Sequence, residues 1–444
     1  MINDKTRRHA YFGVSQGLFL RKFKGGDMRV IRGVLFSAIA ALSLLVSGCN
    51  QSQETIKIGW IDPLSGPFAN VGENGLRSLE LFVEQINERG GVLGGSKFEV
   101  IGLDGKANPQ ESLIAFRKLA DQKVKFIFQG NSSAVAGALT EAVAKHNERN
   151  PDSAIIFMNY AAVDPALTNE RCNFWHFRFD ADIDMKMRAL SDAIAADASV
   201  KKVYLINQDY SFGHAVSNAA KKMLAEKRPD VEIAGDDLHP LGKIKDFAPY
   251  IAKIRASGAD SVITGNWGAD LALLIKAARD SGIEADFYTY YAGIAGGPSA
   301  IGDSGVDRVK QVGQWHVNVG GEASDAITES YRSRYPKNND DLFFLTLKYG
   351  MDLLAQSIDK VGSTDALSVA RALEQGRYQA VTGEVWIRED NHQLMQPLYV
   401  STFKRMGEDG VKYEVEQTGT GPKTDFVVAA ADTAVATTCE MVRP

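Results

Sequence analysis

The stretch "VKFIFQGNSSAVAGAL", residues 124–139, changes its pattern halfway along. Residues 124–129 form a mainly apolar run of strand length, whereas small apolar residues typical of a helix follow Ser132. Gly130, Asn131 and two hydroxyls, Ser132 and Ser133, join the two parts. Asn and Ser commonly cap helices, but an uncapped helix N-terminus with spare hydroxyls also binds anions such as carboxylates. The stretch predicts strand, polar turn and helix, and leaves both roles open for the hydroxyls.

The same alternation extends on both sides of this stretch. The first series predicts strands at 56–61, 98–103, 124–129 and 153–158, with helices at 73–91, 109–119 and 132–147. The second predicts strands at 201–207, 231–238, 259–265 and 285–291, with helices at 212–227, from Asp246, and at 271–281. Alternation of this kind predicts parallel sheets with helices on both faces. Because 444 residues exceed one ordinary core, we expect an α/β fold of two doubly wound parallel-sheet lobes.

Three further segments follow the second series. Residues 340–362 and 365–376 have the apolar spacing of amphipathic helices. Residues 383–404, "GEVWIREDNHQLMQPLYVSTFK", have the pattern of a β-hairpin with the polar "REDNHQ" at its turn.

The N-terminal segment differs from the rest of the chain. Residues 1–48 carry eight Lys and Arg and two Asp, and they end in an uncharged run, "GVLFSAIAALSLLVSGC", that is too short to span a bilayer. This pattern predicts a secretory signal peptide over 1–48, with 1–27 as an upstream extension if translation starts at Met28. The residues before Cys49 are similar to a bacterial lipobox, which predicts lipidation of Cys49 and a tether over 49–54. The alternative is an ordinary signal peptide with a chance cysteine.

Charge and cysteine content indicate which partners and which redox compartment suit the mature protein. Without residues 1–48 the chain keeps 42 of its 50 Lys and Arg and 53 of its 55 Asp and Glu, a net charge of −11. An acidic protein of this kind is a poor partner for nucleic acid, and we expect contact with the membrane through the lipid alone. Cys172 and Cys439 remain as an even pair in an oxidising compartment, which predicts a disulfide. Two unrelated buried thiols are the alternative.

Catalytic and cofactor motifs are missing from the predicted mature sequence. The loop after the first strand, "DPLSGPFANVG", has neither the glycine pattern of a dinucleotide site nor that of a phosphate loop. After residue 48 no G-x-S-x-G or H-E-x-x-H occurs, and the seven His residues of the chain lie singly. We therefore expect no enzyme activity, no metal and no cofactor.

Polar loops follow the predicted strands, where open parallel sheets bind ligands. These loops are "DPLSGPFANVG", "QGNSSA", "NYAAVDPALT", "NQDYSFGHA", "TGNWGADL" and "YYAGIAGG". They combine small residues, hydroxyls, amides and aromatic rings, which is the composition of a pocket for a small organic molecule.

The chain from about Ile56 to about Phe403, which contains these loops, resembles the periplasmic substrate-binding proteins of branched-chain amino acid ABC importers. The likeness rests on "LSGPFANVG", "INERGGVLG", "NSSAVAGAL", "AAVDPALT", "FRFDAD", "NQDYSFG" and "GEVWIREDNHQ" in this order. The resemblance implies a type I periplasmic binding fold with three crossover strands and a cleft between the lobes. The implied division is 55–178 plus 312–377 for lobe 1 and 179–311 plus 378–444 for lobe 2.

The resemblance also implies residues that hold a ligand carboxylate. The family's clamp of a Ser and backbone N–H groups corresponds to Ser132, Ala161 and, approximately, Gly130. Ser133 either joins this clamp or caps the helix, and Ser65 in "LSGPFANVG" completes the first-lobe set. From the second lobe, Phe212 and either Asn266 or Trp267 correspond to closure residues.

Two positions depart from the family pattern. Val163 stands where the family has a ligand-binding Thr, and Tyr291 stands where a Glu pairs with the ligand ammonium. An unpaired buried ammonium is strongly unfavourable, so either Asp209 or Asp180 replaces the Glu, or the ligand is an aromatic or aliphatic carboxylic acid. In the second case the acid would stack on Trp267 or Tyr291.

The sequence thus predicts a monomeric lipoprotein, anchored in the periplasm or at the cell surface. It would bind an amino acid or related carboxylic acid by hinge closure and pass it to the transmembrane subunits of an ABC permease. One alternative is a sensor that uses the same cleft. A secreted α/β hydrolase is the other.

Overall fold

A computed structural model of the chain describes residues 55–337 and 339–444. These residues belong to one unit, Glu54–Pro444. The predicted signal peptide 1–48, the lipidation site Cys49 and the tether 49–54 lie outside the described residues. Within residues 55–337 and 339–444, none of the helices combines the length and apolar character that spanning a bilayer requires.

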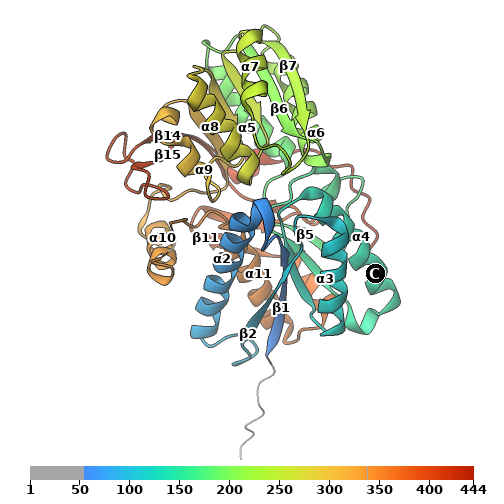
Figure 1. Ribbon diagram of the computed structural model, residues 1–444. Coiled ribbons are helices and arrows are strands. Elements are labelled where there is room, and N and C mark those ends of the chain that lie inside the picture. The colour runs from blue at the N-terminus through green and yellow to red at the C-terminus, as the bar shows by residue number, and fades with distance from the viewer. Residues whose placement is uncertain (1–54, 338) are drawn as a thin grey trace, which may run out of the picture. The chain divides into compact units, whose positions relative to one another are not determined.

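The first lobe contains a five-stranded parallel sheet in the order β2-β1-β3-β4-β5 (Figure 1). Its strands are β1 (Ile56–Asp62), β2 (Phe98–Asp104), β3 (Phe126–Gln129), β4 (Ile156–Asn159) and β5 (His176–Arg178). Helices α2 (Ala69–Glu88), α3 (Pro109–Asp121) and α4 (Ser133–Arg149) follow β1, β2 and β3. At the start of α3, the Asn108 side chain accepts hydrogen bonds from two backbone N–H groups and Pro109 occupies the first turn, as the sequence predicted.

The second lobe contains a seven-stranded sheet in the order β15-β14-β10-β9-β8-β6-β7. Strands β6 (Lys202–Gln208), β7 (Glu232–His239), β8 (Ser261–Thr264), β9 (Asp286–Thr289) and β10 (Val309–Gly313) are parallel, whereas β14 (Leu398–Arg405) and β15 (Thr420–Val428) add antiparallel pairs. The helices of this lobe are α5 (Ile183–Ala196), α6 (Ser211–Lys227), α7 (Ala248–Ser257), α8 (Gly268–Ser281) and α9 (Gly297–Ile301). The predicted α/β class with parallel-sheet lobes is confirmed.

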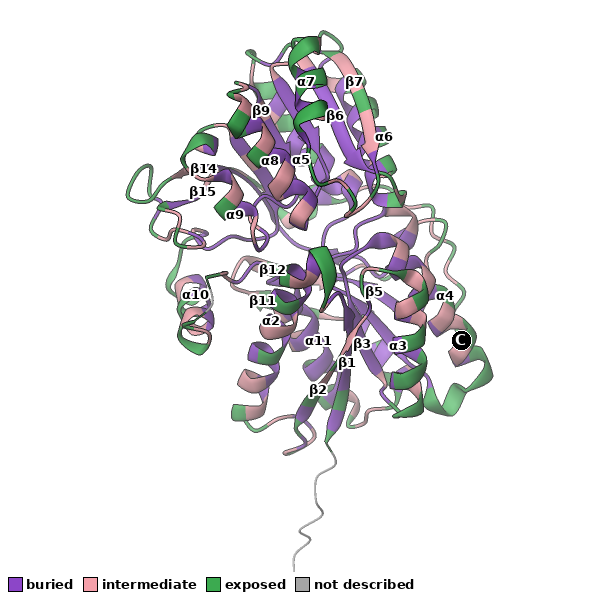
Figure 2. Ribbon diagram, viewed as in Figure 1, coloured by how far each residue is buried: buried purple, intermediate pink, exposed green. Residues whose placement is uncertain are grey.

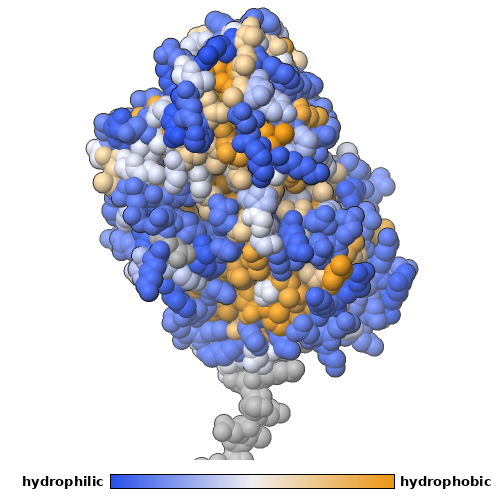
Figure 3. Space-filling model, viewed as in Figure 1, coloured by the Kyte–Doolittle hydropathy of each residue, from blue (hydrophilic) through white to orange (hydrophobic). Residues whose placement is uncertain are grey.

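Alternate residues of the first-lobe strands face two separate cores. Phe126 and Phe128 of β3 pack in the core that also contains α2 and α11 (Thr346–Val361), whereas Ile127 packs with α3 and α4. Successive side chains of a strand point to opposite faces of the sheet, and here both faces are covered, so this strand is apolar throughout. Figure 2 shows the strands as mostly buried. The outer strand β2 is only partly covered, and Figure 3 shows apolar surface there between α2 and α3.

The chain passes between the lobes after β5, after β10 and before β14. The second passage leads through α10 (Glu322–Arg334) to α11, and α12 (Ala366–Leu373) follows. Strand β10 belongs to the second sheet up to Gly313 because it pairs with both β9 and β14. The predicted helix 340–362 begins only at Thr346, since residues 340–345 form an irregular segment.

The predicted hairpin at 383–404 is only half correct. Strands β11 (Arg377–Ala380), β12 (Gly383–Ile387) and β13 (Leu394–Met395) form a small antiparallel sheet, and the chain then leaves for β14. Pro397 follows β13, and a proline cannot donate a ladder hydrogen bond. Strand β11 contacts α11 of the first lobe, and Tyr378 of β11 donates a hydrogen bond to Asp352 at 3.4 Å. Thr382, in the turn before β12, is hydrogen-bonded to Tyr349 of α11 at 2.7 Å. The expected assignment of residues 378–444 to the second lobe stays a prediction beside these contacts.

The C-terminal tail also returns to the first lobe. Cys439 forms a disulfide with Cys172, which lies between β4 and β5, as the cysteine count predicted. Thr437 Oγ1 donates a hydrogen bond to the carbonyl of Thr168 at 2.9 Å, and Arg371 binds the carbonyl of Pro444 at 3.0 Å. The tail thus ends against the segment between β4 and β5 of the first sheet.

Candidate functional site

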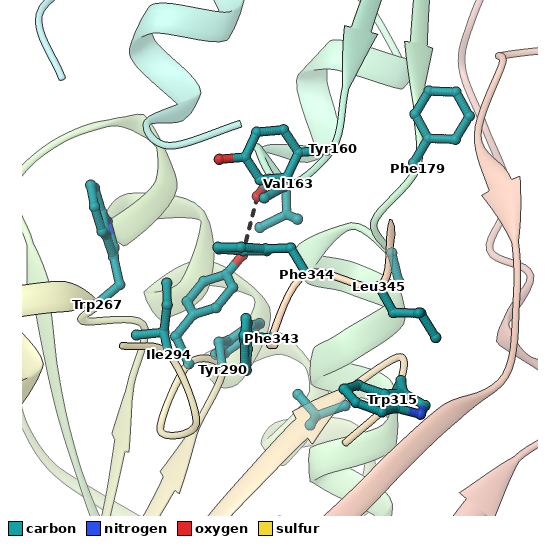
Figure 4. Close-up of a cluster of buried hydrophobic side chains, with 14 of the residues drawn as sticks. Tyr160, Val163, Phe179, Trp267, Tyr290, Ile294, Trp315, Phe343, Phe344 and Leu345 are labelled. Carbon is teal, nitrogen blue, oxygen red and sulfur yellow. Dashed lines mark hydrogen bonds between the residues drawn. The ribbon is translucent and has the colours of Figure 1, made fainter. Parts of the chain in front are cut away.

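A cavity lies at the carboxyl ends of strands from both sheets. First-lobe residues come from the loops after β3 and β4, and second-lobe residues from those after β6, β8 and β9. Its lining consists of Gly130, Asn131, Ser132, Ser133, Ala161, Ala162, Val163, Tyr210, Phe212, Trp267, Tyr291, Ile294 and Phe344. Figure 4 shows Tyr160, Val163 and Phe344 close to Trp267 and Ile294. The structure therefore brings eight of the ten predicted ligand-binding residues to one cavity.

Ser132 is the polar residue with an unused group in this cavity. It occupies the position before the first residue of α4, is 5% exposed, and its hydroxyl finds no hydrogen-bond partner among the described residues. Its φ of 97° is a left-handed conformation that costs a non-glycine residue free energy. A buried hydroxyl without a partner is unfavourable, so the strained backbone and the unpaired group together mark a position that a ligand atom would complete.

The neighbouring polar groups have partners within the protein. The backbone N–H groups of Gly130 and Asn131 donate to the carboxylate of Asp62, at 3.2 Å and 2.9 Å. The Ser133 hydroxyl accepts a hydrogen bond from the N–H of Asp164 at 3.3 Å and does not cap α4. The N–H of Ala161 donates to Asn159 Oδ1 at 3.3 Å. The backbone part of the predicted carboxylate clamp is therefore committed elsewhere at Gly130 and Ala161.

Asp62, at the end of β1, holds the loop that carries the clamp. Its carboxylate also accepts hydrogen bonds from the Tyr160 hydroxyl at 2.7 Å and from Gln129 Nε2 at 3.4 Å. The side chain is 2% exposed, and burial raises its pKa from 3.8 to about 7, although these hydrogen bonds act in the opposite direction. Asp62, which does not itself line the cavity, therefore fixes the positions of the lining residues Gly130 and Asn131 through their backbone N–H groups.

Aromatic side chains from the second lobe form the opposite wall. Trp267 Nε1 donates to the Tyr210 hydroxyl at 2.9 Å, and burial raises the pKa of Tyr210, so this hydroxyl stays protonated with its own hydrogen free to donate. The Tyr291 hydroxyl donates to the carbonyl of Ala161 at 3.3 Å and thus joins the two lobes. Phe212 lies 6.0 Å from Tyr291 between ring centroids.

Two predicted ligand-binding residues lie outside the cavity. Ser65 is exposed and its hydroxyl donates to Asp104, because the loop after β1 turns away from the cavity at this point. Asn266 is buried, but its Oδ1 lies 3.1 Å from Nε2 of His239, within the second lobe. Of the alternative pair Asn266 and Trp267, the structure places only Trp267 in the cavity wall.

Neither candidate for the missing acid lies in the cavity wall. Asp209 is exposed and pairs with His214 at 2.9 Å. Asp180 is buried and pairs with Lys186 at 2.6 Å. None of the lining residues is acidic or basic. Within the described part of the chain, no group of His, Cys, Asp and Glu side chains could hold a metal ion.

Sequence reasoning missed Ile294 and Phe344 as cavity residues. Phe344 comes from the irregular segment before α11 and packs edge-on against Tyr160, with ring centroids 5.0 Å apart. The sequence predicts a helix there, and an apolar residue in a helix pattern gives no sign of a ligand contact. Ile294 lies within the loop "YYAGIAGG", so the loop was predicted but its apolar contact with the cavity was not.

Comparison with known proteins agrees with this geometry. Residues 55–410 match the family described as periplasmic binding protein. The chain is 31% identical over 420 residues to the Leu/Ile/Val-binding protein homolog 4 of Brucella melitensis, covering 92% of this chain and 97% of that protein. It is 28% identical, with a TM-score of 0.78, to a crystal structure titled leucine-, isoleucine-, valine-, threonine-, and alanine-binding protein from Brucella ovis, covering 88% of this chain and 100% of the other.

A more distant solved structure shares the fold. The solute-binding protein of an ABC transporter from R. palustris, solved in complex with benzoate, is 20% identical with a TM-score of 0.74 and covers 87% of this chain and 100% of its own.

Proposed function

This chain belongs to the periplasmic binding protein family, and from that premise we propose that it captures a small carboxylate-bearing solute in the cavity and delivers it to an ABC permease. It is a periplasmic substrate-binding protein of the ABC-transporter class, of the branched-chain amino acid type. The family is one of transport proteins, not of enzymes. The proposal extends to a monomer that a lipid on Cys49 holds at the membrane.

The unpaired Ser132 hydroxyl carries the proposal. It lies inside the cavity at the N-terminus of the 17-residue helix α4. The N-terminal N–H groups of a helix and its dipole favour a negative charge at this place. A ligand carboxylate there would satisfy the hydroxyl, and the Tyr210 hydroxyl across the cavity has a hydrogen to donate.

The charge of the cavity favours a carboxylic acid without an ammonium group. Because the lining lacks an acidic side chain, the ammonium of a free amino acid would have no ion-pair partner there. The aromatic wall of Trp267, Phe212 and Tyr291 suits a flat or branched apolar body. An aromatic carboxylic acid such as benzoate is therefore our first candidate. A branched-chain amino acid is the second, because the relatives with the higher identities carry that name.

Calorimetric titration of the mature protein with benzoate, 4-hydroxybenzoate, leucine and valine tests the proposal. We expect at least one to bind, and a hydrogen bond to a charged group is worth about 1.5–3 kcal/mol. Ser132→Ala should therefore weaken binding by about 10- to 150-fold. Ser65→Ala, an exposed serine of the same lobe, is the matched control and should bind as the wild type does.

Two results would contradict the proposal. One is the absence of binding to every compound of this panel. The other is an unchanged affinity of Ser132→Ala for a compound that the wild type binds. If leucine binds and benzoate does not, the carboxylate site stands and the preference for a ligand without ammonium is wrong.

A further inference from the structure

Phe68 of the first lobe is buried against the second lobe. It ends the short turn η1 (Gly66–Phe68) that precedes α2, and only 4% of its surface is exposed. Its ring lies 4.2 Å from the ring of Trp267 between centroids, at an interplanar angle of 32°. Since η1 follows β1 of the first sheet and Trp267 follows β8 of the second, this aromatic contact crosses between the lobes.

Two glycines of the second lobe make room for the Phe68 ring. A Cβ atom at Gly242 would lie 2.8 Å from Phe68 Cε2, and one at Gly268 would lie 2.8 Å from Phe68 Cδ1. Both glycines have positive φ, 67° and 57°, which residues with side chains rarely adopt. The socket formed by Gly242, Gly268 and Trp267 therefore requires glycine at two positions, for space and for conformation.

A buried acid holds the socket together. Asp270, in the first turn of α8, accepts hydrogen bonds at Oδ2 from the N–H of Gly242 and from Gln208 Nε2, both at 2.8 Å. The side chain is 1% exposed. It ties the turn after β7 to the start of α8, which begins at Gly268. The two glycine turns thus stay at a fixed separation around the ring.

Trp267 belongs to both the socket and the ligand cavity, whereas Phe68 is not a lining residue of the cavity. We propose that Phe68 is a positioning residue that closes the two lobes over the solute by backing Trp267 in the glycine socket. The proposal rests on the solute-binding function proposed above. A bound solute would contact Trp267 from the cavity while Phe68 contacts the same side chain from the first lobe, so the solute and the Phe68–Trp267 contact stabilise the same closed arrangement.

The test measures the affinity and the dissociation rate of benzoate or leucine, whichever the wild type binds more tightly. Phe68→Ala should weaken binding by about 10- to 100-fold, mainly through faster dissociation. Gly242→Ala should weaken it by at least about 10-fold, because the new methyl meets the Phe68 ring. In the double variant the ring is gone, so adding Gly242→Ala to Phe68→Ala should cost less than about 3-fold more.

Phe116→Ala is the matched control, because Phe116 is equally buried but packs in the core between α3 and α4. It should lower the unfolding midpoint and leave the affinity within about 2-fold of the wild type. Unchanged affinity of Phe68→Ala, or fully additive effects in the double variant, would refute the positioning role of Phe68 and leave the proposed solute binding intact. If the wild type binds neither compound, both the positioning role of Phe68 and the solute-binding function on which it rests are refuted.

Discussion

Asp62 gives a prediction whose size follows from its surroundings. The carboxylate is buried behind the cavity wall, and its hydrogen-bond donors, the N–H groups of Gly130 and Asn131 and the side chains of Tyr160 and Gln129, are all neutral. Burial raises its pKa from 3.8 to about 7. The folded protein therefore keeps this proton over a pH range in which the unfolded chain has lost it.

The sign of the effect on stability follows from proton linkage. A group with a raised folded-state pKa contributes stability that is fully present below the unfolded pKa and is lost as the pH rises through the folded pKa. For Asp62 that window runs from 3.8 to about 7. With about 1.4 kcal/mol for each pKa unit, the wild type should lose about 2.5 kcal/mol of unfolding free energy from this group between pH 5 and pH 8.

Urea unfolding of the wild type and of Asp62→Asn at pH 5 and pH 8 measures this loss. Because Asn does not titrate, the stability of the wild type relative to the variant should fall by about 2.5 kcal/mol between the two pH values. Asp104→Asn is the control. Burial raises the pKa of Asp104, but hydrogen bonds from Ser65, Leu64 and Lys106 outweigh it and lower this pKa, so Asp104→Asn should show no comparable change between pH 5 and pH 8. A difference between wild type and Asp62→Asn that does not change with pH would refute the reasoning.

Three other perturbations have defined outcomes. Replacing Cys172 and Cys439 by Ser opens a link across 267 residues and should lower the unfolding free energy by up to about 5–6 kcal/mol in the chain-entropy account; a urea midpoint equal to that of the wild type would contradict this. Lys186→Met leaves the buried Asp180 without its cation and should cost about 3–5 kcal/mol by the same measurement, most of which the added change Asp180→Leu should restore. Tyr291→Phe removes the hydrogen bond to Ala161 between the lobes and should weaken solute binding by up to about 10-fold with little change in the urea midpoint; stronger binding would argue against a closing role.

The repeating parts of the fold could be predicted from the sequence because local patterns encode them. The strand at 124–129 and the helix after Ser132 appear as β3 and α4, and the cap at Asn108 opens α3. Burial on both faces makes the central strands apolar, and a helix N-terminus needs a local acceptor, so both signals lie within a few residues. Elements without such signals were missed, among them the short β5 and the antiparallel β15 at the edge of its sheet.

The candidate site could be predicted only to the level of loops and of the residues that a family likeness supplies. Ser132, Trp267 and Tyr291 lie in the cavity as expected. Asn266 does not, although it is adjacent to Trp267, because consecutive residues of an extended segment point in opposite directions and its side chain meets His239. A one-residue choice of this kind depends on backbone dihedrals that the sequence leaves open.

By itself the sequence determined the α/β alternation and the position of Ser132 at a strand-to-helix turn, and it predicted a disulfide between the two cysteines that follow Cys49 without excluding two separate thiols. Tertiary structure alone decided that Asp62 takes the N–H groups of Gly130 and Asn131, that the C-terminal tail returns to the first lobe, and that Phe68 meets Trp267. The physical reason is the separation along the chain of the residues that each feature depends on. Periodicity and capping depend on neighbours along the chain, whereas the partner of a buried polar or aromatic group is whichever distant residue the packed lobes bring to it.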